Sequence, residues 1–270
     1  MPRTTSQRLE TLTRRWWLYA LILLLFFLPA YSARGYDPRN TSQVITAVLS
    51  NPIIYAYPAL WIVFKVLPIL LIGAIGAWGD RATRVFDGYV AATLLLFALF
   101  QNMARTQEFG LTILLGNTVV YVIVAGLWVY EAIVKENDFT PRPRPPWRYW
   151  VAPAALLAFW FPVNPATLQP DFAPLRFLTN EAGLTLCMML PVYLAVVTLF
   201  WPTINRPVVR VTAFAGMITG LLNMLQWFVL SPQPWLGILH LPMLTISMYA
   251  FGLSFRKGQS EDVRPDHERR

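Results

Sequence analysis

A few polar side chains lie inside long apolar segments of the chain, and their chemistry is that of solute or ion binding. Amides and imidazoles bind small molecules through hydrogen bonds, and a lysine ammonium group can pair with an anion or give up a proton. In apolar surroundings each such group costs free energy unless it finds a partner, which makes it a candidate for function. The candidates are Lys65, Gln101, Asn102, Asn117, Glu131, Glu181, Asn223, Gln226 and His240.

The apolar segments carry none of the sequence patterns that are typical of catalysis or metal binding. They contain no paired aspartates, no GxSxG nucleophile elbow, no HExxH pair and no glycine-rich phosphate loop. His240 has no second ligand near it in the sequence, because the other histidine, His267, lies in the carboxyl-terminal tail. Haem usually needs two axial ligands and zinc three or four, so we expect no cofactor, no metal site and no catalytic residue.

The composition of the chain is that of an integral membrane protein. Its 270 residues are 56% hydrophobic and only 13% charged, and the mean hydropathy is +0.47. A soluble domain carries about 25% charged residues, so this composition excludes a soluble enzyme, a disordered protein and a nucleic-acid-binding module. The net charge of +8 is therefore attributed to membrane topology and not to nucleic-acid binding.

Apolar segments separated by proline, glycine and charge predict an all-α protein with about eight transmembrane helices. A hydrocarbon core about 30 Å thick needs about 20 apolar residues of helix. The candidate spans are 16–32, 54–77, 88–104, 111–133, 149–163, 183–201, 211–230 and 235–254. Two further segments, 40–51 and 174–178, are amphipathic and are predicted to form short helices at the membrane interface.

The distribution of basic residues predicts that both termini face the cytoplasm of a prokaryotic plasma membrane. With an even number of spans, the predicted inner segments hold Arg3, Arg8, Arg14, Arg15, Arg81, Arg84, Lys135, Arg142, Arg144, Arg148, Arg206, Arg210 and the basic tail 256–270. The predicted outer segments hold Arg34, Arg39, Arg105 and Arg176. An excess of arginine and lysine on one side marks the cytoplasmic side. The tail 256–270 is expected to be disordered.

The two halves of the chain share a pattern that suggests a tandem duplication. Segments 15–29 and 148–162 align without gaps, and they match at Arg15/Arg148, Trp17/Trp150 and Pro29/Pro162. Four-span halves at 1–133 and 149–255 would insert in the same orientation and be related by an axis along the membrane normal. The segment 134–148, rich in proline and arginine, would be a stiff cytoplasmic linker. The alternative is that any short-looped spans show such a pattern.

Six of the polar candidates are expected at one depth, in the outer half of the bundle. These six are Gln101, Asn102, Asn117, Asn223, Gln226 and His240. They either line a polar vestibule or form hydrogen bonds between helices. Lys65 is expected about 6–15 Å below the outer interface, where it either snorkels or pairs structurally, or belongs to a solute pathway. Glu131 is expected to pair with Lys135 one helical turn away at the inner edge.

These features support two main functional hypotheses and a third. The first is a non-enzymatic permease or transporter-like protein for a small neutral or weakly charged solute. The second is a structural or anchoring subunit of a larger membrane complex, because almost nothing in the chain could couple to an ion or a nucleotide. An intramembrane transferase acting on lipid is the third, although no acid pair supports it. The expected partners are the lipid bilayer, a small solute, and complex subunits or further copies of the chain, and no nucleic acid.

Overall fold

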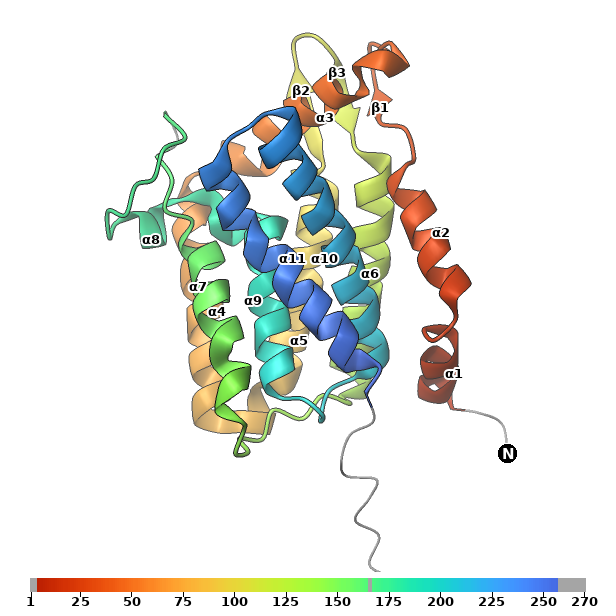
Figure 1. Ribbon diagram of the computed structural model, residues 1–270, viewed down its shortest axis with the longest axis vertical. Helices are drawn as coiled ribbons and strands as arrows, with labels where there is room; N and C mark the ends of the chain where they lie inside the picture. The colour runs from red at the N-terminus through yellow and green to blue at the C-terminus, as the bar shows by residue number, and fades with distance from the viewer. Residues whose placement is uncertain (1–3, 165–166, 257–270) are drawn as a thin grey trace, which may run out of the picture.

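The computed structural model describes residues 4–164 and 167–256, which form a mostly helical bundle. Figure 1 shows the long helices running along the longest axis, with three short strands gathered at one end. The α-helices are α1 (Thr5–Leu12), α2 (Trp16–Phe26), α3 (Thr41–Ser50), α4 (Ala59–Trp78), α5 (Thr83–Leu96), α6 (Leu115–Val134), α7 (Val151–Trp160), α8 (Arg176–Thr179), α9 (Leu186–Leu199), α10 (Arg206–Leu225) and α11 (Pro234–Ser254). The 3-10 segments are η1 (Pro38–Asn40), η2 (Ile53–Ala56), η3 (Gly79–Ala82), η5 (Pro146–Trp150) and η6 (Glu181–Leu184), and two π-helical segments are η4 (Phe97–Gln101) and η7 (Gln226–Leu230).

Among the described residues, four helical runs are long and apolar enough to cross a membrane. They are Ala59–Gln101, Leu115–Val134, Arg206–Leu230 and Pro234–Ser254. A fifth is reached only if Arg176–Leu184 and Leu186–Leu199, which meet at 93°, are counted as one bent span. These helices agree with the prediction of a multi-span helical membrane protein. They do not support eight full-length spans, because α2 and α7 have only 11 and 10 residues.

Proline explains why two of the predicted spans are short. Helix α2 ends at Phe26, just before Pro29 in the following loop. Helix α7 ends at Trp160, and Phe161 takes a left-handed conformation with φ of 50° directly before Pro162. A proline lacks the backbone N–H that a helix needs and disfavours helical conformation in the residue before it.

Three short strands at one end of the bundle correct the expectation of an all-α fold. They are β1 (Tyr31–Ser32), β2 (Met103–Thr106) and β3 (Gly110–Ile113), in the order β1-β3-β2 with antiparallel pairing. Predicted spans 88–104 and 111–133 therefore extend too far, because their facing ends pair as a hairpin in which Met103 lies opposite Ile113. Gly110, with φ of 68°, supplies the left-handed residue that this turn requires. We call this end of the bundle the strand end.

The two predicted amphipathic segments are helical in the structure. Residues 40–51 contain α3, which buries Val44 and Val48, and residues 174–178 overlap α8. Helix α3 packs beside the strands at the strand end (Figure 1). The prediction of short helices in these segments is confirmed.

Helix α9 lies at the centre of the bundle. Every residue from Met188 to Thr198 is buried, so this helix has no face turned away from the protein. Tyr193 Oη lies 2.9 Å from Thr93 Oγ1 of α5 in a hydrogen bond between the two helices. Polar groups that face α9 must therefore find their partners inside the protein.

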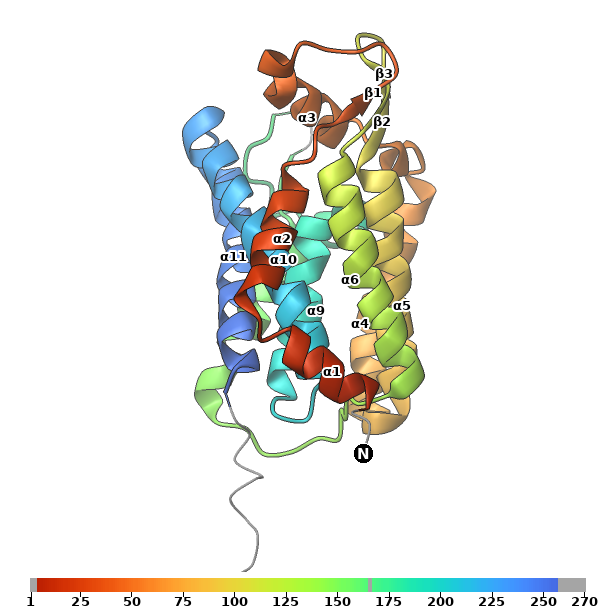
Figure 2. The same cartoon turned by 90° about the vertical axis from the view of Figure 1, so that its right-hand side faces the viewer.

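The first and last described helices end together at the opposite end of the bundle, which we call the terminal end (Figure 2). Arg210 of α10 is fully buried there and joins them. Its Nη2 donates to Glu10 Oε1 of α1 at 3.2 Å and to Ser254 O of α11 at 2.6 Å. Its Nη1 donates to Thr13 Oγ1 at 2.7 Å. Residues 257–270 lie outside the described residues, so the expected disorder of the tail stays a prediction.

The expected position of Arg210 in an inner loop is wrong. Helix α10 begins at Arg206, five residues before the predicted span, because the side chain of Asn205 accepts a hydrogen bond from Val208 N and caps the helix. Arg210 therefore lies one turn inside the helix, with its guanidinium group turned into the protein.

Candidate functional site

Three of the predicted outer polar residues lie where α5 ends and α6 begins. Gln101 ends η4, and its Oε1 accepts a hydrogen bond from Leu186 N at the start of α9, at 2.8 Å. Asn102 Nδ2 donates to Phe97 O at 3.1 Å, and its Oδ1 accepts from Asn117 Nδ2 at 3.1 Å. These amides satisfy the ends of helices and join neighbouring helices, as the hydrogen-bonding alternative expects.

Two more of the six residues bond within the second half of the chain. Asn223 of α10 donates from Nδ2 to Cys187 Sγ of α9 at 3.3 Å. His240 is buried, and its Nδ1 lies 2.7 Å from Leu236 O, one turn earlier in α11. Its ring centroid is 6.0 Å from that of Trp227. Both side chains thus have partners within the bundle.

Gln226, the sixth residue, borders an open cavity at the strand end. The cavity has a volume of about 570 Å³ and lies between α3, the β2–β3 hairpin and η7. Its lining is Ser42, Gln43, Thr46, Ala47, Glu108, Phe109, Gln226, Leu230 and Ser231. Gln226 therefore faces a cavity at the strand end, whereas Gln101 and Asn223 both meet the start of α9, at Leu186 and Cys187.

Lys65 of α4 is fully buried and points toward α7 and α8. Its Nζ donates to the backbone oxygen of Phe159 and lies 4.4 Å from the centroid of that ring. No ion pair to Lys65 occurs among the described residues, although Glu181 of η6 acts on it electrostatically. The side chain does not snorkel to the surface, and its ammonium group is held within the protein by a backbone oxygen and an aromatic ring.

Two fully buried carboxyl groups lie near the terminal end, on the first turns of α5 and the last turns of α6. They belong to Asp87 and Glu131, and both are 0% exposed. The aromatic rings of Phe86, Trp128 and Phe139 pack against one another beside them, with Phe86 and Phe139 centroids 5.4 Å apart. Burying a carboxyl group in such surroundings costs free energy, so such a group is a functional candidate.

Two asparagines connect these acids. Asn137 Nδ2 donates to Asp87 Oδ1 at 3.0 Å, and the backbone N–H of Asn137 donates to Glu131 Oε1 at 2.6 Å. Asn205 Nδ2 donates to Glu131 Oε2 at 2.6 Å, and Asn205 N donates to Asn137 Oδ1 at 2.7 Å. We call these four residues the acid network.

The acid network has one unsatisfied atom. Asp87 Oδ2 is buried and has no hydrogen-bond partner in the described part of the chain. Over the same residues neither Asp87 nor Glu131 forms an ion pair with a basic side chain. Burial without a cation disfavours two negative charges that share one hydrogen-bonding residue, Asn137, so the network is suited to hold a proton or to bind a polar group at Asp87.

The sequence pointed to only part of this network. The predicted third span began at residue 88, which left Asp87 in a loop, whereas α5 begins at Thr83. The expected pair of Glu131 with Lys135 is wrong, because Lys135 Nζ lies 2.6 Å from Asp80 Oδ2 instead. Lys135 caps the carboxyl end of α6 with a left-handed backbone conformation (φ 56°), so its side chain is turned away from Glu131. The signal in the sequence was one acid near the start of one helix, Asp87, and one near the end of the next, Glu131.

Metal binding has no support in the described residues, where no group of three or more histidine, cysteine, aspartate or glutamate side chains is placed to hold an ion. Comparison of the chain with known protein families, with curated proteins and with solved structures finds no match.

Proposed function

We propose that this protein is a membrane-embedded permease for a small neutral or weakly charged solute. The observation that carries the proposal is the unpartnered carboxyl oxygen of Asp87 within the buried acid network. A structural role would be served equally by a neutral amide, which costs less to bury. A carboxyl group retained in this place is suited to exchange a proton or to hydrogen-bond a passing solute. The outer cavity beside Gln226 would be the entrance.

The proposal includes eight membrane segments, some of them shorter than a full span. The run Ala59–Gln101 has 43 residues, and as one straight helix it would extend about 65 Å, twice the thickness of a bilayer core. Gly79, with φ of 53°, ends α4, and η3 leads into α5. We therefore count α4 and α5 as two crossings. Helices α2, α7 and α9 would be partial crossings completed by the loops that follow or precede them.

The order of elements supports the tandem duplication as part of the proposal. When β1, β2, β3, η1 and η3 are set aside, since they have no counterpart in the second half, the first half runs α2, α3, η2, α4, α5, η4 and α6, and the second runs α7, α8, η6, α9, α10, η7 and α11. In each half one long helix, α5 or α10, continues directly into a π-helical segment, η4 or η7. A parallel repeat would place both halves in the same orientation, with an axis along the membrane normal.

The orientation we propose places the terminal end in the cytoplasm of a prokaryotic plasma membrane. Helix α1 and Ser254 meet at that end through Arg210. The turn between α4 and α5 and the 134–148 segment, both of which carry arginines, lie at the same end (Figures 1 and 2). A topology reporter fused to the carboxyl terminus should read as cytoplasmic, and an external signal would contradict this orientation.

The permease function is tested by solute entry into proteoliposomes. Vesicles containing the purified protein are mixed with urea or glycerol as probes, and swelling is followed by stopped-flow light scattering. We expect faster entry of at least one probe than into empty vesicles, and slower entry for Gln226→Ala at equal protein content. Entry at the rate of empty vesicles for both probes would count against the permease.

A structural subunit of a membrane complex is the second candidate. The observation that favours it is that five of the six outer polar residues have hydrogen-bond partners within the chain. In that case His240→Ala and Asn102→Ala should lower the abundance of the protein or release a partner during purification. Neither the wild type nor the variants would then let solute enter faster than empty vesicles do.

A further inference from the structure

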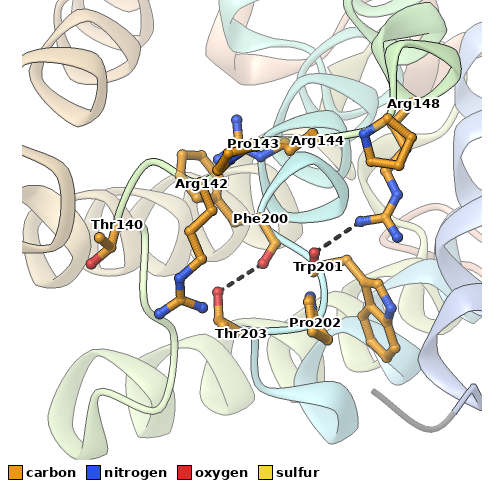
Figure 3. A pocket seen from close by; sticks show the side chains of 10 residues that line it. Thr140, Arg142, Pro143, Arg144, Arg148, Phe200, Trp201, Pro202 and Thr203 are labelled. Carbon is orange, nitrogen blue, oxygen red and sulfur yellow. Dashed lines mark hydrogen bonds between the residues drawn. The ribbon is translucent and has the colours of Figure 1, made fainter. Parts of the chain in front are cut away.

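A second pocket lies at the terminal end, where the 134–148 segment crosses the turn between α9 and α10. It has a volume of about 210 Å³, and Figure 3 shows the side chains that line it. Three of them are arginines, Arg142, Arg144 and Arg148, and none is acidic. Prolines at 143 and 145 alternate with the arginines and restrict the backbone that carries them. The pocket is therefore a basic hollow on a stiff segment.

Two guanidinium groups in this pocket have buried N–H groups without partners. Arg144 Nη2 and Arg148 Nε are buried and have no hydrogen-bond partner in the described residues. The Arg144 guanidinium carbon lies 4.0 Å from the centroid of the Phe200 ring, in a cation–π contact with a residue of the pocket wall. Arg148 Nη1 donates to Trp201 O at 2.9 Å (Figure 3). Guanidinium groups stay charged at all ordinary pH values, so these unpaired donors attract an anion.

One acid near the pocket leaves most of this charge unbalanced. Asp138 Oδ2 lies 2.6 Å from Arg142 Nη2. Desolvation opposes the charge of Asp138, yet hydrogen bonds from Thr140 and the neighbouring Arg142 hold its pKa below the usual value. Asp138 is thus a carboxylate that neutralises Arg142. Over the described residues Arg144 and Arg148 have no carboxylate partner.

We propose that this pocket binds a phosphate group through Arg144 and Arg148. The planar fork of arginine matches the oxygens of a phosphate, and each charge-assisted contact is stronger than a neutral hydrogen bond. Trp147, Tyr149 and Trp150 beside the pocket are 55%, 48% and 38% exposed. Exposed aromatic rings of this kind mark the membrane–water interface, which is the depth at which lipid phosphates lie.

The experiment is calorimetric titration of the full-length protein in a non-ionic detergent. The probes are inorganic phosphate, short-chain phosphatidylglycerol and phosphatidylcholine of the same chain length. We expect Arg144→Gln and Arg148→Gln each to weaken about tenfold the binding of inorganic phosphate or phosphatidylglycerol, whichever the wild type binds, since each removes a charge-assisted contact. Arg84→Gln is the matched control, because Arg84 is exposed at the same end and does not line the pocket. Arg144→Lys keeps the charge and should weaken binding less.

The outcomes separate the two sources of the phosphate. Binding of phosphatidylglycerol but not phosphatidylcholine, weakened in Arg144→Gln, supports a lipid headgroup. Binding of inorganic phosphate that Arg144→Gln weakens, with no effect of phosphatidylglycerol, supports a free phosphate. Affinities that are equal in the wild type and Arg144→Gln, or lowered just as much by Arg84→Gln, would overturn the proposal, as would the absence of binding by all three probes. Melting curves of each variant check that the fold is retained.

Discussion

The side-chain amide of Asn137 donates a hydrogen bond to Asp87 Oδ1 over 3.0 Å, and this bond joins the segment after α6 to the start of α5. Asn137 is 2% exposed, and Phe139 near it is fully buried. The side chains of Asn137 and Phe139 therefore anchor the first part of the 134–148 segment to the bundle. The arginines of this segment follow Phe139 and lie at the surface, where they line the pocket that we propose binds phosphate.

Asn137→Ala should destabilise the protein. The change removes the donor to Asp87 Oδ1 and the acceptor of Asn205 N. Each buried polar group left unpaired costs about 1–3 kcal/mol. The free energy of unfolding in detergent should fall by several times as much as for Asn51→Ala, an exposed asparagine at the end of α3. Equal free energies of unfolding for the two variants would show that the hydrogen bonds of Asn137 in the acid network do not stabilise the protein.

Glu10→Gln should loosen α1 from the bundle. It removes the carboxylate that faces the buried guanidinium group of Arg210. Because Glu10 is partly exposed, we expect a loss of roughly 1 kcal/mol and faster trypsin cleavage near Arg14 and Arg15. Arg14→Gln, which removes a more exposed partner of Glu10, should change the stability by less than about 0.5 kcal/mol. Unchanged cleavage in Glu10→Gln would contradict this role.

Gly220→Ala should disrupt the packing of α10 against α11. A Cβ atom at Gly220 would lie 2.9 Å from Leu244 Cα, closer than real contacts allow. Small residues let membrane helices approach closely in this way. Gly126→Ala in α6 has open space around it and should gain about 1 kcal/mol from helix propensity. The melting temperature should fall in the first variant and rise in the second, and a rise in both would contradict the α10–α11 contact.

Lys65→Met should leave the melting temperature unchanged or raise it. The substitution replaces a buried ammonium group, which has no ion pair among the described residues, by an apolar side chain of similar length. Little is therefore lost besides the hydrogen bond to Phe159 O. Lys135→Met, in contrast, removes a partly exposed ion pair with Asp80 and should cost less than about 1 kcal/mol. A clear drop for Lys65→Met alone would show that the lysine stabilises the contact of α4 with α7.

Hydropathy predicted the long helices and missed the acid network for one physical reason. Segment 235–254 agrees closely with α11, and segment 111–133 agrees with α6 apart from the residues that form β3, because those helices are apolar along their length. The start of α5 carries Arg84 and Asp87, and charge in an apolar pattern predicts a loop unless the charged group is buried by distant residues. That burial depends on Asn137, 50 residues away in the chain.

The predicted outer residues take part in several different contacts for a related reason. Residues at the same depth on different helices share a site only if their helices present the same face. His240 bonds to its own helix at Leu236 O, and Asn223 faces Cys187 of α9. Depth can be counted from the sequence, whereas the rotation of each helix is set by tertiary packing.

The central claim is that Asp87 serves transport and not stability, and solute entry by Asp87→Asn proteoliposomes tests it most directly. Asparagine keeps the shape and can still accept the hydrogen bond from Asn137, so folding, abundance and melting temperature should match the wild type. We predict that solute entry falls to the rate of empty vesicles. Entry at the wild-type rate in this variant, or a loss of folded protein that accounts for the loss of entry, would contradict the claim.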